Sequence, residues 1–329
     1  MTAPAGTFQT YQAIGDREDL SDIIYDISPT DTPFMSNVGR GKASYTLVEW
    51  QTDSLAAANA DNAVIEGDDA TTNTASPTTR FGNYCQIMQK VPRVAGTQRA
   101  VNSAGRRDEL SYQIAKSGRE LKRDMEARLT SIQGGAAGDS ASARETAGLG
   151  AWLFGNQVLA ANGGTAPTTG TAPTVASGVP TTDVAAGTAG TFLEDDLKTA
   201  ISNCWDDGGD PTLIMVGSFN KKAASNFSGI GTQYRDVQPS PAAPGTIVGA
   251  ADLYVSDFGT HQIVANRFQN STVAYVLDLE YWEVSYLRPI GQSPLAKTGD
   301  SERRLINTEF ALYAKNPDSS AMVSALTTS

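Results

Sequence analysis

Residues 107–133 read RDELSYQIAKSGRELKRDMEARLTSIQ, the longest continuous helical pattern in the chain. Apolar positions recur in it at steps of three and four, which places them on one stripe of an α-helix. Most charges fall on the remaining surface, where Lys122 with Glu126 and Asp124 with Arg128 form opposite-charge pairs four residues apart. Gly134 and Gly135 predict the end of the helix. The stripe consists of Leu110, Ile114, Gly118, Leu121, Met125, Leu129 and Ile132.

A helix of this length is a rod of about 40 Å at 1.5 Å per residue. Such a rod needs a sheet or a partner along its length, because only then is its apolar stripe removed from water. We therefore expect an α+β protein in which a sheet or a partner covers the apolar stripe of the long helix.

Composition narrows the class of protein. The 329 residues hold 25 Lys and Arg against 36 Asp and Glu, a net charge of −11, which argues against tight nucleic-acid binding over a large face. Cys85 and Cys204 are far apart and are expected to be free thiols in a reducing compartment. The first residues lack the pattern of a secretory leader, and no apolar run is long enough to span a bilayer.

The N-terminal third predicts two extended parts. Residues 1–40 form an irregular arm, with a short helix at about 20–27 and with Pro29 and Pro33 expected to block regular structure. Strand periodicity at 45–50 is answered by a β-prone run at 81–94, which predicts a hairpin. The connecting residues 56–79 are rich in Ala, Asn, Thr and Asp and cannot supply a core of their own.

The remaining chain predicts an α/β portion and a return to strands. Residues 162–190 are a Gly/Thr/Ala/Pro/Ser run with a single charge, Asp183, and are expected to form a flexible insertion. A helix follows a capping-box pattern at 191–194, and Ser218 is expected to cap a second helix through Phe227. Strands are expected at 213–216, 253–255, 262–265, 273–277, 281–287, 306–314 and 322–326.

The sequence offers no motif for catalysis, and we expect no catalytic residue, no metal site and no cofactor. His261 is the single histidine and is expected in a loop or at a strand edge, since no nucleophilic serine motif accompanies it. One histidine and two separated cysteines cannot form a usual zinc site. The acidic clusters at Glu66, Asp68 and Asp69 and at Asp206, Asp207 and Asp210 lack the spacing of a calcium loop and are expected in solvated turns.

The order of these parts resembles the major capsid protein of tailed bacteriophages, the Hong Kong 97-like fold. Individual strings resemble one branch of that family. They are GDREDLSDII at 15–24 with SP at 28–29 and DTPF at 31–34; EW at 49–50 with Asp53; ELKRDME at 120–126; DFG at 257–259 with NRF at 266–268; and LRP at 287–289 with PLAKTGD at 294–300.

The resemblance implies five parts. Residues 1–40 would be the N-terminal arm, 41–92 the extended loop, and 93–150 a peripheral domain with a spine helix. Residues 151–278 would be an axial domain that contains the insertion 162–190, and 279–329 would be return strands of the peripheral and axial domains. The last strand is expected to rejoin the axial domain.

It also implies a function. The chain would be a structural subunit of an icosahedral phage capsid in the virion, assembled in the host bacterial cytoplasm as hexamers and pentamers around double-stranded DNA. Partners would be further copies of itself, the portal, separate scaffold and decoration proteins, and the packaged DNA through weak non-specific contact, without a membrane. Two alternatives stay open: another virion surface, decoration or adhesin-type structural protein, and a carbohydrate-active enzyme with carboxylates in a cleft.

Two expectations concern maturation. Some members of the fold lose a long N-terminal segment, whereas here the arm-like residues begin near Met1, so we expect no large propeptide. Other members cross-link a lysine of the extended loop to an asparagine of a neighbour. No lysine occurs between Lys42 and Lys90, so we expect no such cross-link.

Overall fold

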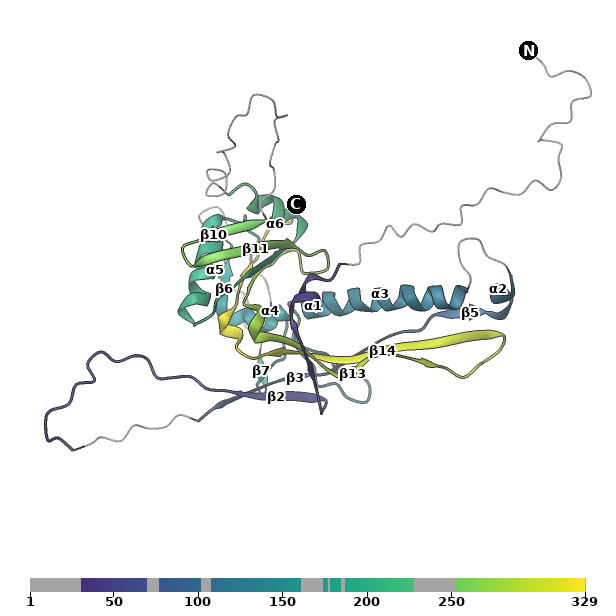
Figure 1. The fold of residues 1–329 in the computed structure, drawn as a ribbon, viewed down its shortest axis with the longest axis horizontal. Helices are drawn as coiled ribbons and strands as arrows, with labels where there is room; N and C mark the ends of the chain where they lie inside the picture. Colours follow the sequence, from purple (N-terminus) through teal and green to yellow (C-terminus); the bar gives the residue numbers. More distant parts are fainter. Residues whose placement is uncertain are drawn as a thin grey trace, which may run out of the picture.

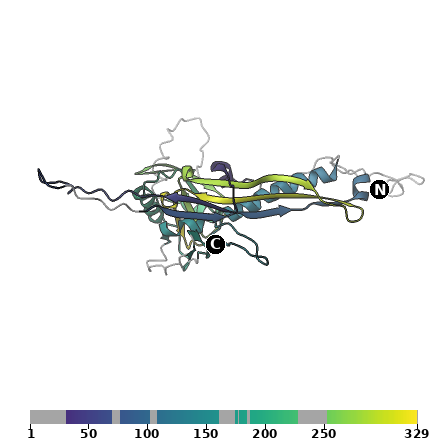
Figure 2. The same ribbon diagram turned by 90° about the horizontal axis from the view of Figure 1, so that it is seen from below.

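The structure is a computed structural model that describes residues 31–69, 77–101, 108–160, 174–176, 178–184, 187–227 and 252–328. A body with mixed helices and strands occupies the middle (Figure 1). The long helix α3 and the strands β13 and β14 extend from it in one direction, and the hairpin of β2 and β3 projects in the other (Figures 1 and 2). The predicted helix at 20–27 lies outside the described residues.

The long helix α3 spans Glu109–Leu129, and it begins where Asp108 caps it. The Asp108 carboxylate accepts hydrogen bonds from the backbone N–H groups of Leu110 and Ser111 at 3.2 and 3.3 Å. The predicted apolar stripe is confirmed at its main positions, since Leu110, Leu121, Met125 and Leu129 are all buried. Gly118 does not join that packing, because a Cβ built there meets no atom within 4 Å.

The predicted end of this helix was wrong by several residues. The helix stops at Leu129, and the hydroxyl groups of the next two residues donate to carbonyls of its last turn in addition to the backbone N–H groups. Thr130 Oγ1 donates to the carbonyl of Glu126, and Ser131 Oγ donates to that of Arg128, each at 2.8 Å. Gly134 therefore lies in the following loop.

The two charge pairs predicted along the helix were also wrong. Asp124 pairs with Lys90 of the neighbouring strand at 2.7 Å, and Arg128 pairs with Glu145 at 3.2 Å. Glu126 is fully buried, although its spacing from Lys122 placed it on the charged surface. Other parts of the chain pack over the C-terminal part of the helix. They cover a side that the spacing of charged residues alone predicted to be exposed to solvent.

A five-stranded sheet lies along α3. Its order is β1, β13, β14, β4, and β5 also pairs with β14; β1 runs parallel to β13 and the other pairs are antiparallel. Helix α3 contacts β14, β4 and β5, so it covers this sheet as predicted. The strands are β1 (Gly39–Lys42), β4 (Gln86–Lys90), β5 (Arg93–Ala95), β13 (Trp282–Pro294) and β14 (Ser301–Ala314).

The predicted strand at 81–94 is three strands. Only β3 (Thr79–Tyr84) pairs with β2 (Leu47–Thr52), from Leu47 opposite Tyr84 to Thr52 opposite Thr79. Beyond the buried Cys85 the chain joins the five-stranded sheet, where β4 pairs with β14. The hairpin was predicted correctly, but pairing with β14 could not be read from local periodicity.

A six-stranded sheet forms the other half of the body, in the order β10, β11, β9, β12, β15, β6. Helix α5 (Glu194–Asp206) packs Leu197 and Ile201 against one face, beside Ile214 of β9. The C-terminal strand β15 lies between β12 and β6. The strands are β6 (Gln157–Leu159), β9 (Leu213–Val216), β10 (Leu253–Ser256), β11 (Gly259–Ala265), β12 (Ala274–Leu277) and β15 (Ala321–Ser324).

Both sheets share one core around the C-terminal end of α3. The cluster contains Met125 and Leu129 of the helix, Met215 and Tyr275 of the six-stranded sheet, and Phe310 of the five-stranded sheet. The two halves therefore meet in one hydrophobic core. The shorter helices are α1 (Pro33–Asn37), α2 (Gly96–Ala100), α4 (Leu149–Trp152) and α6 (Ser218–Ala224), with 3₁₀ turns at Leu153–Asn156, Leu279–Tyr281 and Pro317–Ser319.

Several local predictions need correction. Pro33 does not block a helix but begins α1, since proline is tolerated in the first turn. Helix α5 is capped two residues later than the predicted pattern, where the backbone N–H of Leu193 donates to Asp196 Oδ2 at 3.2 Å. Gly217 precedes α6, so Ser218 is its first residue and not its cap.

Candidate functional site: the projecting hairpin and the polar junctions at its base

The β2–β3 hairpin carries a long connection that leaves the body. Every described residue from 53 to 69 is exposed. The apolar side chains Leu55, Val64 and Ile65 are 99, 84 and 78% exposed. In the view from below, this connection extends far beyond the sheets (Figure 2). The isolated chain thus leaves an apolar segment without cover.

Aromatic side chains anchor the hairpin at its base. Trp50 of β2 is 7% exposed, with ring centroids 5.4 Å from Trp152 and 4.4 Å from Tyr313. Phe81 of β3 meets Trp152 edge-on at 6.1 Å. Aromatic pairs at these separations stabilise a structure beyond the free energy gained by burying their surface. These contacts therefore hold the hairpin against α4 and β14.

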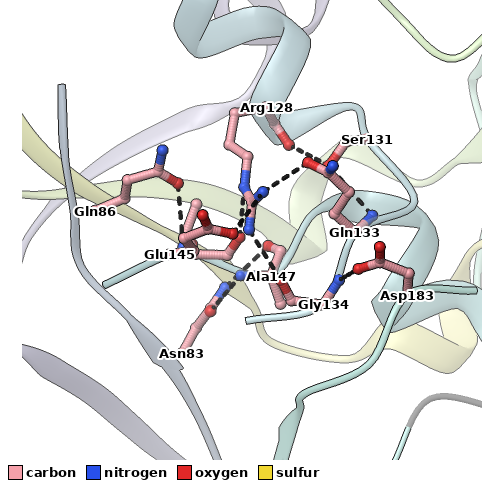
Figure 3. A network of polar contacts seen from close by, with 10 residues as sticks. Asn83, Gln86, Arg128, Ser131, Gln133, Gly134, Glu145, Ala147 and Asp183 are labelled. Carbon is pink, nitrogen blue, oxygen red and sulfur yellow. Dashed lines mark hydrogen bonds and ion pairs between the residues drawn. The ribbon is translucent and has the colours of Figure 1, made fainter. Parts of the chain in front are cut away.

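Asn83 joins the hairpin to the body by hydrogen bonds. This fully buried side chain donates from Nδ2 to the carbonyls of Ala147 and Leu312, at 3.2 and 2.8 Å. Its Oδ1 accepts the backbone N–H of Ala147 at 2.8 Å (Figure 3). A buried amide that meets three backbone groups of the body, in addition to the neighbouring N–H of Tyr84, fixes the direction in which β3 leaves the sheet.

Arg128, in the last turn of α3, organises the loop that follows the helix. Its guanidinium donates to the carbonyls of Thr146 and Gly134, each at 2.9 Å, and to Gln133 Oε1 at 2.6 Å (Figure 3). Burial lowers the pKa of Arg128 below its usual range, and the carboxylate of Glu145 opposes that shift. The guanidinium stays charged at neutral pH. Its hydrogen bonds join the segment directly after α3, at Gln133 and Gly134, to the segment before α4, at Thr146.

The described part of 162–190 packs onto the same junction. Asp183 Oδ1 accepts the backbone N–H of Gly134 at 3.0 Å, and Val184 donates to the carbonyl of Ile132 at 3.0 Å (Figure 3). Strands β7 (Val175–Ala176) and β8 (Val179–Pro180) form a small hairpin whose turn contains Gly178, at φ +78°. A Cβ on Gly178 would lie 2.3 Å from the carbonyl oxygen of Arg80, so only glycine allows this approach to β3.

A second buried polar group joins the N-terminal segment to α3. The carboxylate of Glu126 accepts the backbone N–H groups of Phe34 and Met35, at 2.8 and 2.9 Å. It also accepts Asn266 Nδ2, after β11, at 2.8 Å. Burial raises the pKa of Glu126 above its usual 4.5, and the three hydrogen bonds oppose that shift. Three segments distant in sequence therefore meet at one carboxylate.

A third carboxylate lies where β13 and β14 cross the body. Glu309 is almost fully buried and pairs with Arg144 at 2.6 Å and with Arg288 at 2.9 Å. The register of β13 shifts on both sides of Arg288. Two cations on one carboxylate tie the loop before α4 to the strands that extend along α3.

The residues considered for catalysis do not form a reaction centre. His261 is buried in the middle of β11, so its predicted place in a loop or at a strand edge was wrong. Its Nδ1 donates to the carbonyl of Pro211 at 2.5 Å, and its Nε2 lies 2.7 Å from Ser256 Oγ. No carboxylate completes a triad among these contacts; the histidine joins the turn after β10 to the segment before β9.

The acidic clusters do not form a metal centre in the part of the chain that the structure describes. No group of three His, Cys, Asp or Glu side chains in it is arranged as metal ligands. Glu66, Asp68 and Asp69 lie in the exposed connection, while Asp207 borders a groove of about 690 Å³ at the base of the hairpin. Burial and the charge of Asp207 raise the pKa of Asp318 in this groove.

Both cysteines are free, as predicted, and the structure buries both of them. Burial is the main cause that raises the pKa of Cys85 to about 11 and that of Cys204 to about 12. Neither thiol therefore has the properties of a nucleophile at neutral pH. None of the described helices combines the length and apolar character that crossing a bilayer requires.

Solved structures show which proteins share this fold. The cyanophage A-1(L) capsid asymmetric unit matches with a TM-score of 0.70 at 11% identity, covering 97% of this chain and 99% of that one. A chain from Gordonia phage Cozz matches with a TM-score of 0.59 at 12% identity, covering 99 and 98%. The chain thus has the fold of phage capsid proteins.

Sequence comparison defines the protein more closely. The major capsid protein of Escherichia phage Phieco32 is 28% identical over 357 residues, covering 96% of each protein. Residues 3–327 match the family model of the SU10 major capsid protein. The chain belongs to this family: it is a phage major capsid protein, a structural part of the virion and not an enzyme.

Proposed function

We propose that this chain adopts the Hong Kong 97-like fold and builds an icosahedral shell, as hexamers and pentamers, around double-stranded DNA. One observation carries the proposal. The connection between β2 and β3 exposes Leu55, Val64 and Ile65, and its described residues pack against no part of their own chain. Apolar side chains presented in this way need cover from another molecule, and in a shell the neighbouring copies provide it.

The parts of the chain take roles within that proposal. Residues 1–40 are the arm, 41–92 the extended loop, and 93–150 the peripheral domain with α3 as its spine. Residues 151–278 form the axial domain and 279–329 the return strands, with β15 completing the axial sheet. The long α3, sheet and β13–β14 pair on one side and the six-stranded sheet on the other support this division.

The proposed partners follow from the same role. They are further copies of the chain, a portal, separate scaffold and decoration proteins, and DNA held by weak non-specific contact. Assembly takes place in the host bacterial cytoplasm. The net charge of −11 supports weak contact with DNA, because an acidic subunit does not retain the polyanion tightly.

Electron microscopy of the purified full-length chain tests this function. Shells, tubes or isolated capsomers are expected, whereas monomers under all solution conditions would contradict it. A variant in which a short Gly-Ser turn replaces residues 54–77 should remain folded, because β2, β3 and their aromatic anchors are intact. It should form no shells, and normal shells from this variant would show that the connection is dispensable.

A further inference from the structure

An exposed aromatic pair lies at one corner of the six-stranded sheet. Trp205, in the last turn of α5, is 58% exposed, and Phe258, in the turn between β10 and β11, is 39% exposed. Their ring centroids are 5.4 Å apart, and we call the two residues the aromatic corner. The other tryptophans of the chain are buried, namely Trp50, Trp152 and Trp282. Paired rings that stay in water are suited to contact with another molecule.

Both rings stand on supports that hold them in place. Helix α5 buries Ile201 in the core beneath it, which fixes the helix that carries Trp205. The backbone N–H of Phe258 donates to Ser256 Oγ at 3.2 Å, and this hydroxyl lies 2.7 Å from Nε2 of the buried His261. A surface that is already ordered loses little conformational freedom when a partner docks. The aromatic corner is thus a preformed surface. Helix α5 and strands β10 and β11 lie in the part of the body away from the end to which α3 extends (Figure 1).

Negative charge surrounds the aromatic corner. Asp206 and Asp207 directly follow Trp205, and Asp257 directly precedes Phe258. All three carboxylates are exposed, and none has an ion-pair partner in the part of the chain that the structure describes. Helix α5 ends here without a basic residue in its last turn, although the negative end of a helix dipole favours cations. A cation supplied by another molecule would therefore be stabilised at this corner.

An aromatic face beside free carboxylates fits a guanidinium group in particular. Arginine stacks its planar group on an aromatic ring and can donate to a carboxylate at the same time, whereas the lysine ammonium is more strongly hydrated. A second copy of the chain has few such groups to offer. Every described arginine except Arg40 and Arg267 is engaged in an interaction within its own chain.

We infer that the aromatic corner is a docking surface for an arginine-bearing segment of a separate protein. The arginine stacks on Trp205, and Asp206 and Asp257 accept its N–H groups. The inference rests on the proposed function, in which separate proteins attach to the shell, and it names the surface and the chemistry of one such attachment. Assembly of the copies does not need this surface, so shells should form when it is altered.

Dye-labelled peptides test this surface on the full-length chain. The probe is a capped peptide with two arginines between glycines, and two further peptides carry lysine or glutamine in place of arginine. Fluorescence anisotropy at low salt measures their binding. The variants are Trp205→Leu and the double change Asp206→Asn with Asp257→Asn. The control carries Asp68→Asn with Asp69→Asn, which removes the same charge from the exposed connection between β2 and β3. Thermal melts establish that each chain is folded.

The arginine peptide is expected to bind wild type and the control equally, and each variant at least about fivefold more weakly. It should also shift the fluorescence emission of Trp205 in wild type, while the glutamine peptide should not. Equal binding of the arginine peptide to wild type and both variants would overturn the inference. Equal binding of the lysine peptide to wild type would overturn the choice of arginine. If Trp205→Leu does not fold, Phe258→Leu and the shape-conserving asparagine variant decide.

Electron microscopy of the same preparations separates this inference from the proposed function. Normal shells from all variants, together with weakened peptide binding, would support both. A folded Trp205→Leu chain that forms no shells beside a normal control would show that the aromatic corner is a contact between copies, and would overturn the inference. Wild-type chains that form neither shells nor capsomers would contradict the proposed function, while the peptide titration would still decide the role of the corner.

Discussion

The carboxylate of Glu126 on α3 accepts the backbone N–H of Phe34 at 2.8 Å and so holds a segment 92 residues earlier against the long helix. Phe34 is itself fully buried in the shared core. The same carboxylate binds Met35 and Asn266. The entry of the N-terminal segment into the body thus depends on one side chain.

Replacing Glu126 by leucine removes the acceptor but keeps most of the side-chain volume. Three buried donors then lose their partner, and each unsatisfied group costs about 1–3 kcal/mol. We expect the free energy of unfolding to fall by at least that amount, and proteases to cleave more readily near Phe34. Glu120→Leu, on a half-exposed position of the same helix, is the control. Equal effects of the two changes in a denaturant titration would contradict the role of Glu126.

Asn83 allows a similar test at the base of the hairpin. The change Asn83→Ala leaves the N–H and carbonyl of Ala147 and the carbonyl of Leu312 without this side-chain partner. We expect a loss of at least about 2 kcal/mol in the free energy of unfolding. Asn62→Ala in the exposed connection should change it by no more than about 0.5 kcal/mol. A chain that tolerates both changes equally would show that Asn83 does not fix the hairpin.

The stripe of α3 predicts how the helix is stabilised. Leu121 is fully buried and Lys122 beside it is exposed. Leu121→Ala should lower the free energy of unfolding by about 2–5 kcal/mol through lost burial and a cavity. Lys122→Ala should change it by no more than about 0.5 kcal/mol. Thermal melts of the two variants measure the difference. Similar melting temperatures would show that the helix face containing Leu121 does not pack into the core.

The features of the fold that could be predicted from sequence are those set by residues close together in the chain. The stripe of α3, the hairpin and most strands follow from local periodicity, because side chains at steps of three and four or of two share a face. Lys122 and Glu126 show where that reasoning ends. Their spacing predicts a surface pair, yet the α1 segment covers Glu126 and supplies two of the three hydrogen-bond donors that make its burial tolerable.

The polar junctions were missed for the same reason. Asn83 lies in a strand and Arg128 in the last turn of a helix, and nothing in their neighbouring residues predicts that backbone groups more than a dozen residues away will surround them. A polar residue inside an otherwise core-facing pattern is the one available signal.

The thiols give a test of burial. The raised pKa values of Cys85 and Cys204 keep both thiols protonated well above pH 8, so little thiolate is available. Ellman's reagent at pH 8 should leave the folded chain unmodified and should titrate both cysteines in guanidinium chloride. Rapid reaction of one thiol in the folded chain would contradict its burial. Above pH 9 the unfolded chain loses these protons first, so stability should decline as the pH rises.

We expect the mature particle to hold together without covalent bonds between subunits. An isopeptide bond from the projecting connection needs a lysine amine there, and no lysine occurs between Lys42 and Lys90. Lys42 lies in β1, and Lys90 is in an ion pair with Asp124 at 2.7 Å, so neither belongs to the connection. Buried Cys85 and Cys204 cannot reach a neighbouring copy. Particles boiled in detergent with reductant should therefore give one band near 34.6 kDa, whereas a ladder of multimers would contradict this expectation.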